Sequence, residues 1–440
     1  MEPSITTQPA AAGGPPGTWL VRIGVRTLAL YLLLQNLSAL VGLLPSLAGA
    51  DDWVRNGLKH ASAWLGKTVL GIGREIPVGL TGSSDTTADW IRTGAFLMLA
   101  ALAGLIWSVR DRRAQTDAQV GGWMRLGLRY VLGAAMLAYG FMKIVPPTQF
   151  PAPSFWQLTS PFAEASPQGL LWRFMGFSPA YVAFLGGAEV AAGLFLYFRR
   201  TTLLGALLTV GIMTNVVMLN FCYDVPVKLY SSHLLLMAAT LAWPDRRHVI
   251  GFLFSGRGGA TRAEEVSLPT GLGGRRLAMI GKVFFLGSAL YSSIGAQWKE
   301  RWTVVDRYGS TPAELRGIWR VEQFVRDGVS VPPLATDPLR WGMLIFGDYR
   351  VVVARQVDGH RSAVWYVKRG ATAGAYEFQT PGSKATSLPV TITREGPSQM
   401  ALALVWEGAA VKVVLMRVDE NKFTLLSRGF HWVTEVSFNR

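Results

Sequence analysis

Long apolar segments separated by short polar links dominate the first 294 residues. Several windows hold about 18 to 23 mostly apolar residues, the length that a helix needs to cross a bilayer. We therefore predict seven membrane-spanning helices, at residues 27–44, 91–109, 124–145, 179–198, 202–221, 229–243 and 277–294.

The periodicity changes from helical to alternating after residue 316. Short alternating runs, the first of which begins at Gly317, are separated by turn residues such as Asp358 and Gly359. Eight or nine such strands in about 125 residues predict a small antiparallel β-barrel, a fold that leaves no exposed sheet edge. The predicted fold class is thus a multi-pass α-helical membrane protein with a C-terminal antiparallel β-barrel domain.

These patterns divide the chain into seven parts. They are a disordered N-terminus (1–18), the first two helices with an outer surface loop (19–122), a four-helix membrane unit (123–250), a cytoplasmic loop (251–276), the seventh helix (277–294), a linker (295–316) and the extracytoplasmic barrel (317–440). The first apolar run has a basic flank and ends at Ala48 and Ala50, so it is either a retained helix, which we favour, or a signal peptide. Residues 51–89 are either a helix on the membrane surface or a solvated loop.

The composition agrees with a membrane protein. Half of the 440 residues are apolar and only 16% are charged. The net charge of +15 does not indicate nucleic-acid binding, because the arginines cluster beside apolar segments, where they determine membrane topology. A single cysteine, Cys222, excludes an intrachain disulfide and a cysteine-based metal site.

Arginine pairs set the predicted orientation. With the N-terminus inside, every second connection is basic, as the positive-inside rule requires. The basic positions include Arg22, Arg26, Arg110, Arg199, Arg200, Arg246 and Arg247. Residues 51–89, 146–178, 222–228 and everything after about 295 are then outside. The connection 146–178 is rich in proline and aromatic residues, so we expect short helices that fold back over the helix bundle as a lid.

The most polar stretch at membrane level runs from residue 215 to residue 234. Asn220 lies in an apolar run, Asp224 and Lys228 flank a turn, and His233 starts the next apolar run. These groups form either a ligand site or structural contacts: Asp224 can pair with Lys228 to hold the turn, and His233 can be a packing histidine or a proton carrier.

Three further polar residues lie within or at the end of apolar segments. Glu189 lies near the middle of the fourth predicted span, where a carboxylate must pair, stay protonated or exchange protons. Lys143 follows Tyr139 by one turn at the end of the third, so both side chains project from one side of that helix. Lys143 is either an interfacial anchor or a ligand contact.

No known catalytic or metal-binding motif is present. The five histidines are widely scattered, and HExxH, GxSxG, phosphate-loop and CxxCH patterns are absent from the sequence. We therefore predict no metal centre.

Residues 123–250 resemble the DoxX-like four-helix membrane proteins of bacteria. The resemblance rests on Tyr139 and Lys143, the QFP run from Gln149, Glu189 in a glycine-rich helix, and the LNFCYDVPVK run from Leu219. It implies a bacterial inner-membrane protein whose family includes members associated with quinone-linked sulfur redox chemistry. The chain departs from small members of that family by its additional helices and its barrel, which is similar to lipocalin-type barrels in opening on Gly317-x-Trp319.

These features are compatible with two alternative functions. In the first, an outer-face pocket in the membrane binds a quinone-like or other small ligand and works with a redox partner subunit. Its predicted residues are Tyr139, Lys143, Glu189, Asn220, Asp224, Lys228 and His233. In the second, the protein is a non-catalytic envelope protein: the barrel binds a ligand or partner, and the helices anchor it or carry the ligand across the bilayer.

Overall fold

The computed structural model of the chain describes residues 16–42, 50–79, 81–145, 149–255, 272–382, 386–428 and 432. It divides into two compact units. The helical unit is formed by Met1–Gln149 with Ala180–Gln297, and the barrel unit by Phe150–Pro179 with Trp298–Arg440. Most of the predicted disordered N-terminus and of the predicted cytoplasmic loop lies outside the described residues, as does the end of the first apolar run.

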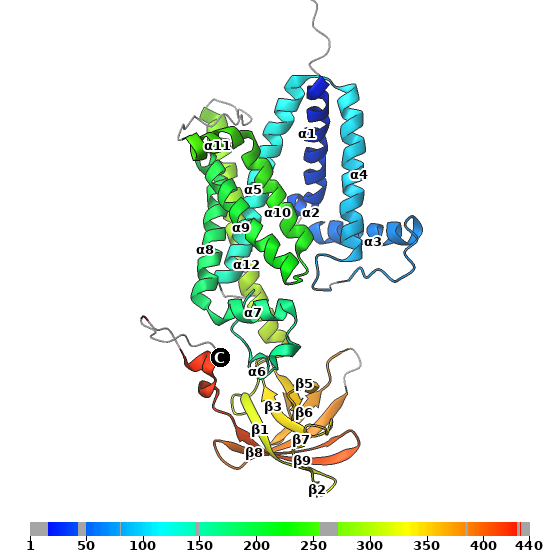
Figure 1. Cartoon of the computed structure of the whole chain (residues 1–440), viewed down its shortest axis with the longest axis vertical. Helices are drawn as coiled ribbons and strands as arrows, with labels where there is room; N and C mark the ends of the chain where they lie inside the picture. Colours follow the sequence, from blue (N-terminus) through cyan, green and yellow to red (C-terminus); the bar gives the residue numbers. More distant parts are fainter. Residues whose placement is uncertain are drawn as a thin grey trace, which may run out of the picture. The chain divides into compact units, whose positions relative to one another are not determined.

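The helical unit is a bundle whose long helices run side by side (Figure 1). Its helices are α1 (Pro16–Gln35), α2 (Leu37–Gly42), α3 (Ala50–Thr68), α4 (Thr87–Arg110), α5 (Ala114–Ile144), α8 (Pro179–Tyr197), α9 (Thr202–Cys222), α10 (Lys228–Ala242), α11 (Arg246–Ser255) and α12 (Leu272–Tyr308), with short 3-10 turns η3 (Arg199–Thr201) and η4 (Trp243–Asp245). Four helical segments are long and apolar enough to cross a membrane: Thr87–Arg110, Pro179–Tyr197, Arg199–Cys222 and Arg276–Lys299. All seven apolar segments predicted from the sequence lie on helices where the chain is described.

Two of the predicted boundaries differ from the structure. The first helix begins at Pro16 and is interrupted at Asn36, whose side-chain Nδ2 donates to Leu32 O at 2.8 Å, the same carbonyl that accepts from Asn36 N at 3.1 Å. The last helix continues to Tyr308, through most of the predicted linker, and ends before Gly309, whose φ of +63° is typical of a helix C-terminus. Of the two readings of residues 51–89, the helix holds for the first part, which forms α3, Ala50–Thr68.

Charged side chains on α5 connect the helices around it. Arg125 donates to Leu241 O at 3.0 Å, and Arg129 donates to Leu196 O at 3.0 Å. These carbonyl groups lie in the last turns of α10 and α8, where a helix leaves carbonyl groups without a donor of its own, and the two buried arginines donate to them. The helix α5 thereby holds the ends of α8 and α10. These contacts help to set the positions along the bundle of the polar residues on those helices.

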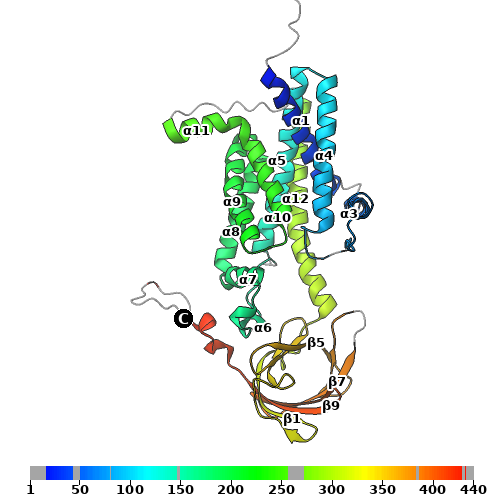
Figure 2. The same ribbon diagram turned by 45° about the vertical axis from the view of Figure 1, so that its right-hand side comes forward.

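The C-terminal strands form the predicted antiparallel barrel. They are β1 (Gly317–Arg326), β2 (Val329–Ser330), β3 (Trp341–Phe346), β4 (Val351–Gln356), β5 (Arg361–Arg369), β6 (Ala375–Gln379), β7 (Ser387–Arg394), β8 (Gln399–Trp406) and β9 (Ala409–Arg417). Apart from the two-residue β2, neighbouring strands pair in chain order, and β1 pairs with β9 to close eight strands (Figure 2). This confirms the predicted closed barrel.

Aromatic side chains fill the barrel core. Trp341 lies 5.7 Å from Trp365 and 4.9 Å from Trp406, measured between ring centroids. Trp319 is fully buried, and its Nε1 donates to Leu315 O at 2.7 Å. Inward and outward residues alternate along β8 and β9, which is why the alternating pattern was readable in the sequence.

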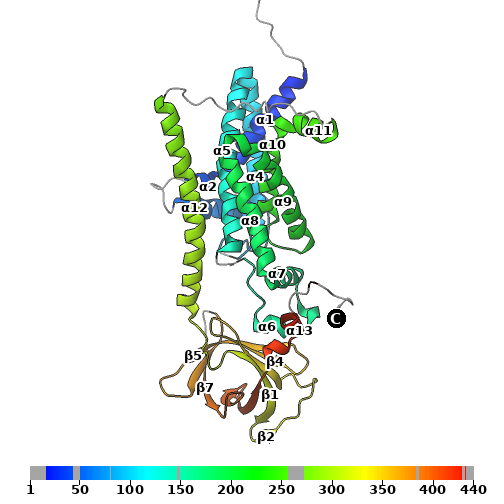
Figure 3. The ribbon, with the colours of Figure 1, turned by 90° about the vertical axis from the view of Figure 1, so that its left-hand side faces the viewer.

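The barrel unit also contains the segment Phe150–Pro179, which we call the strap (Figure 3). It contains three short helices: α6 (Phe155–Leu158), η2 (Phe162–Glu164) and α7 (Pro167–Phe177). Two more, η5 (Glu420–Lys422) and α13 (Thr424–Ser427), follow the last strand. The strap joins α5 to α8, the two helices that carry the buried charges described next.

Candidate functional site

Glycines bring α5 and α8 unusually close together. A Cβ atom on Gly140 would lie 2.7 Å from Gly186 O, and one on Gly186 would lie 2.7 Å from Gly140 O. One on Gly193 would lie 3.0 Å from Gly133 O. The two glycines of each helix are seven residues apart and therefore lie on one face, so the antiparallel helices touch backbone to backbone, as small residues allow in membrane helices.

This close crossing brings Lys143 to Glu189. Lys143 Nζ lies 2.7 Å from Glu189 Oε2, and the two side chains are only 7% and 5% exposed. The lysine side chain leans toward the N-terminus of its helix, which carries the ammonium group back into the bundle. The carboxylate that the sequence placed inside an apolar helix is therefore paired with a cation, which offsets much of the cost of its burial.

The close approach of Gly186 to α5 predicts that alanine substitutions at Gly186 and at the adjacent Gly187 have different effects on stability. Gly186→Ala should lower the free energy of unfolding by about 1–3 kcal/mol, because its Cβ atom meets backbone and the Lys143 Cβ at 2.8 Å. The adjacent Gly187 has no atom within 4 Å of the same position, so Gly187→Ala should be neutral or should stabilise the helix by up to about 1 kcal/mol. Reversible unfolding in mild detergent compares the two; equal effects would contradict the crossing.

Two tyrosines lie beside the ion pair. Lys143 Nζ is 5.7 Å from the Tyr139 ring centroid, and the Tyr139 ring is 5.9 Å from that of Tyr230 on α10. Among the described residues, neither tyrosine hydroxyl has a hydrogen-bond partner. The α5, α8 and α10 helices thus present a buried ammonium–carboxylate pair next to two hydroxyl groups that are able to donate.

His233 forms a separate contact with α1. Its Nδ1 lies 2.6 Å from Leu229 O, which only accepts, so Nδ1 carries the proton and Nε2 accepts from the Tyr31 hydroxyl at 2.6 Å. Gln35 donates to the same tyrosine oxygen at 3.2 Å. His233 is three residues, less than one helical turn, from Tyr230, so α10 links this pair to the tyrosines near Lys143.

The other predicted site residues make local contacts. Asp224, at a φ of 51°, pairs with Lys228 at 2.7 Å across the turn between α9 and α10, with 83% of the Asp224 side chain exposed. Asn220 donates to Ser231 Oγ at 3.0 Å. Of the seven predicted residues, Tyr139, Lys143 and Glu189 come together in direct contact, while His233, Asn220 and the Asp224–Lys228 pair each have different partners.

Sequence reasoning missed several contributors. Asp85 accepts from Lys228 N at 2.7 Å and Leu229 N at 2.9 Å, and so caps the start of α10. Tyr31 and Tyr230 are ordinary members of apolar runs. Neither tyrosine stands out in the sequence, because a tyrosine in such a run is equally compatible with a side chain that faces lipid.

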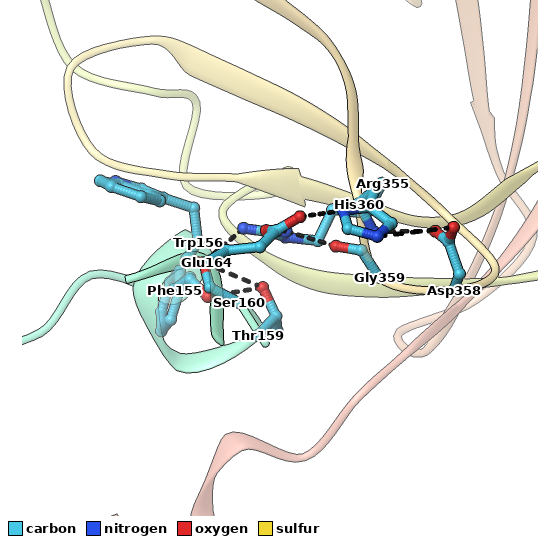
Figure 4. A network of polar contacts seen from close by, with 9 residues as sticks. All are labelled: Phe155, Trp156, Thr159, Ser160, Glu164, Arg355, Asp358, Gly359 and His360. Carbon is cyan, nitrogen blue, oxygen red and sulfur yellow. Dashed lines mark hydrogen bonds and ion pairs between the residues drawn. The ribbon is translucent and has the colours of Figure 1, made fainter. Parts of the chain in front are cut away.

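The barrel unit holds a second polar cluster, centred on Arg355 of β4 (Figure 4). The guanidinium, 3% exposed as a side chain, donates to Trp156 O at 3.0 Å, Ser160 Oγ and Gly359 O, and lies 3.4 Å from Glu164 Oε2. His360 also contacts Glu164. Burial lowers the pKa of Arg355, and the nearby Glu164 carboxylate opposes that shift.

An apolar contact lies on the same outer wall of the barrel. Ile318, Ile345 and Val353 face outward from β1, β3 and β4, are almost fully buried, and pack with Phe155 of the strap and Phe423 after β9. We expected the strap to fold back over the helix bundle. Its short helices are confirmed, and Phe155 packs on the barrel, where β3 and β4 are apolar on both faces and need a cover.

The chain thus combines apolar helices of membrane-spanning length with a C-terminal closed eight-stranded β-barrel. A buried Lys–Glu pair joins α5 to one of those helices, α8. The chain is 33% identical over 125 residues to the uncharacterized protein YwoB of Bacillus subtilis (strain 168), a match that covers 28% of this chain and 77% of YwoB. The chain belongs to the same family as YwoB. No family model and no solved structure matches it.

Proposed function

We propose that the protein is a multi-pass bacterial inner-membrane protein of the DoxX-like type, whose helical unit binds a quinone-like or other small ligand as part of a membrane redox process. The observation that carries this proposal is a pair of tyrosine hydroxyls, on Tyr139 and Tyr230, that have no hydrogen-bond partner among the described residues and lie next to the buried Lys143–Glu189 pair. A polar group at this depth is costly unless it is satisfied, and a ligand oxygen would satisfy it.

The proposed topology has seven spans with a cytoplasmic N-terminus. Four helices meet the length and apolarity that a span requires, and α1, α5 and α10 complete the seven. With 15 residues, about 22 Å, α10 is shorter than the bilayer core and needs local thinning or polar neighbours at its ends. The arginine-rich connections favour this orientation, and it places the strap and the barrel on the same outer side, which their membership of one compact unit supports.

The chemistry of the site fits a ligand with carbonyl oxygens. Tyr139 and Tyr230 donate hydrogen bonds to such an oxygen. Lys143 stabilises negative charge that develops there when a redox partner subunit supplies electrons. Glu189 and the neutral His233 are the groups available to exchange the accompanying proton.

A second candidate function has one observation in its favour. Trp341 Nε1 is buried in the aromatic core of the barrel, and among the described residues it has no hydrogen-bond partner. A lipocalin-type barrel that binds an apolar ligand with one acceptor oxygen, anchored by the helices as a non-catalytic envelope protein, accounts for that donor.

Native mass spectrometry with lipid extraction separates these functions. We expect wild-type protein to co-purify with a quinone-like molecule that Tyr139→Phe/Tyr230→Phe loses. Tyr291→Phe, a change on the exposed side of α12, should retain it. A ligand lost only in Trp341→Phe would favour the barrel instead. No co-purifying ligand, or one that remains in every variant, would contradict both.

A further inference from the structure

The strap carries large aromatic side chains that are largely exposed. Phe162 is 75% exposed, and Phe174 and Phe177 on α7 are 65% and 48% exposed. The opposite face of α7 is buried through Leu171, Met175 and Gly176. One face of α7 therefore packs within the strap, and the other face is apolar and largely exposed.

The inner face of α7 is held firmly. A Cβ atom on Gly176 would lie 2.0 Å from Pro151 O, so the helix backbone lies directly against the start of the strap. Phe150 and Trp172 stack edge to face with ring centroids 5.0 Å apart. These contacts fix the rotation of α7 about its own axis. Phe174 and Phe177 therefore point away from the packed side of the strap.

Chain continuity places the end of α7 next to the start of a candidate membrane helix. Only Ser178 separates the end of α7 at Phe177 from the start of α8 at Pro179, so the two ends are within about 8 Å of each other. On α8, a candidate span, Tyr181 and Phe184 are exposed at 42% and 69%. Exposed aromatic residues thus occur on both sides of this junction, in the strap and in the candidate span.

Aromatic rings of this kind are enriched where a bilayer meets water, and a short helix with one apolar face binds in the plane of that interface. We propose that the strap anchors the barrel to the membrane surface: Phe162, Phe174 and Phe177 enter the headgroup region of the bilayer, while the opposite side of the strap holds the barrel through Phe155 and Arg355. The inference rests on the proposed membrane placement of α8.

The alternatives are an open face in water and a face covered by another protein, such as a second copy. Collision of spin labels with two reagents separates all three environments, because oxygen concentrates in lipid, a neutral nickel chelate stays in water, and protein excludes both. Full-length protein in phosphatidylethanolamine–phosphatidylglycerol vesicles is labelled at single cysteines in a Cys222→Ser background. The test positions are Phe174→Cys and Phe177→Cys. Phe184→Cys on α8 and Val405→Cys, 61% exposed on β8, are the references.

We expect labels at 174 and 177 to collide more with oxygen than with the nickel chelate, as at 184, and the ratio to reverse at 405. Labels at 174 and 177 that behave like 405, or that both reagents fail to reach, would overturn the anchor while the membrane placement stands. A label at 184 that behaves like 405 would overturn the membrane placement and the anchor with it.

Discussion

Lys143→Met should lower the free energy of unfolding of the helical unit by about 3–5 kcal/mol, the cost of leaving a buried charge without its partner. Glu189 would then be a carboxylate between α5 and α8 with 5% of its side chain exposed. Glu189→Gln should destabilise for the converse reason, because it leaves the Lys143 ammonium uncompensated. Unfolding measured reversibly in mixed detergent micelles gives both values.

The double variant Lys143→Met/Glu189→Leu provides the decisive comparison. With both charges replaced by apolar groups of similar size, it should recover most of the stability that each single change loses. Lys228→Met is the matched control, because it breaks an ion pair of the same 2.7 Å length whose Asp224 side chain is 83% exposed, and it should cost at most about 1 kcal/mol. A double variant no more stable than the worse single one would contradict the ion pair.

The expected loss of stability in the single variants determines which substitutions can test the ligand site. A single charge removal destabilises the fold as well as the site, so loss of ligand from Lys143→Met or Glu189→Gln alone does not identify a binding residue. Tyr139→Phe and Tyr230→Phe remove only hydroxyl groups that have no protein partner in the described chain, and their effect on binding is interpretable.

Arg355→Met should release the strap from the barrel. The guanidinium is buried and makes hydrogen bonds to Trp156 O and Gly359 O, while it also faces Glu164, so its removal should cost about 2–4 kcal/mol of barrel-unit stability. Backbone amides of α6, such as those of Gln157 and Leu158, should then exchange hydrogen faster. Hydrogen exchange followed by mass spectrometry of the full-length protein measures this directly.

Arg361→Met is the control for the strap contact, because Arg361 is exposed at the start of β5, near the same β4–β5 turn. It should change stability by about 0.5 kcal/mol or less and leave exchange in α6 unaltered. Arg355→Lys should recover little, since one ammonium group cannot reproduce the forked donors of the guanidinium. Unchanged exchange in α6 of Arg355→Met would show that Phe155 and its apolar contacts suffice.

Sequence patterns predicted the features that depend on local periodicity. The alternation along β8 and β9 indicated the barrel, and the apolar runs located the helices. A carboxylate inside such a run was enough to single out Glu189, because burial makes it chemically exceptional wherever its partner lies.

Contacts between residues far apart in the sequence could not be predicted from those patterns. Tyr31 and His233 are 202 residues apart, and Arg355 and Glu164 are 191 residues apart. Spacing along one helix fixes no distance to another, so the sequence could not separate Asp224 and Lys228 from the buried pair. The contact of the strap with the barrel was not predicted, because its aromatic residues fit a helical surface and a barrel wall equally well, and only the two-sided apolar strands β3 and β4 indicate a cover on the barrel.

We propose that a ligand with carbonyl oxygens binds between α5 and α10, beside Lys143 and Glu189. A photoreactive benzoquinone, cross-linked to the full-length protein in native membranes and mapped by peptide mass spectrometry, tests its position directly. We expect labelling around Tyr139 and Tyr230 that excess unlabelled quinone prevents. Labelling confined to the strands of the barrel, or labelling that excess quinone does not prevent, would contradict the claim.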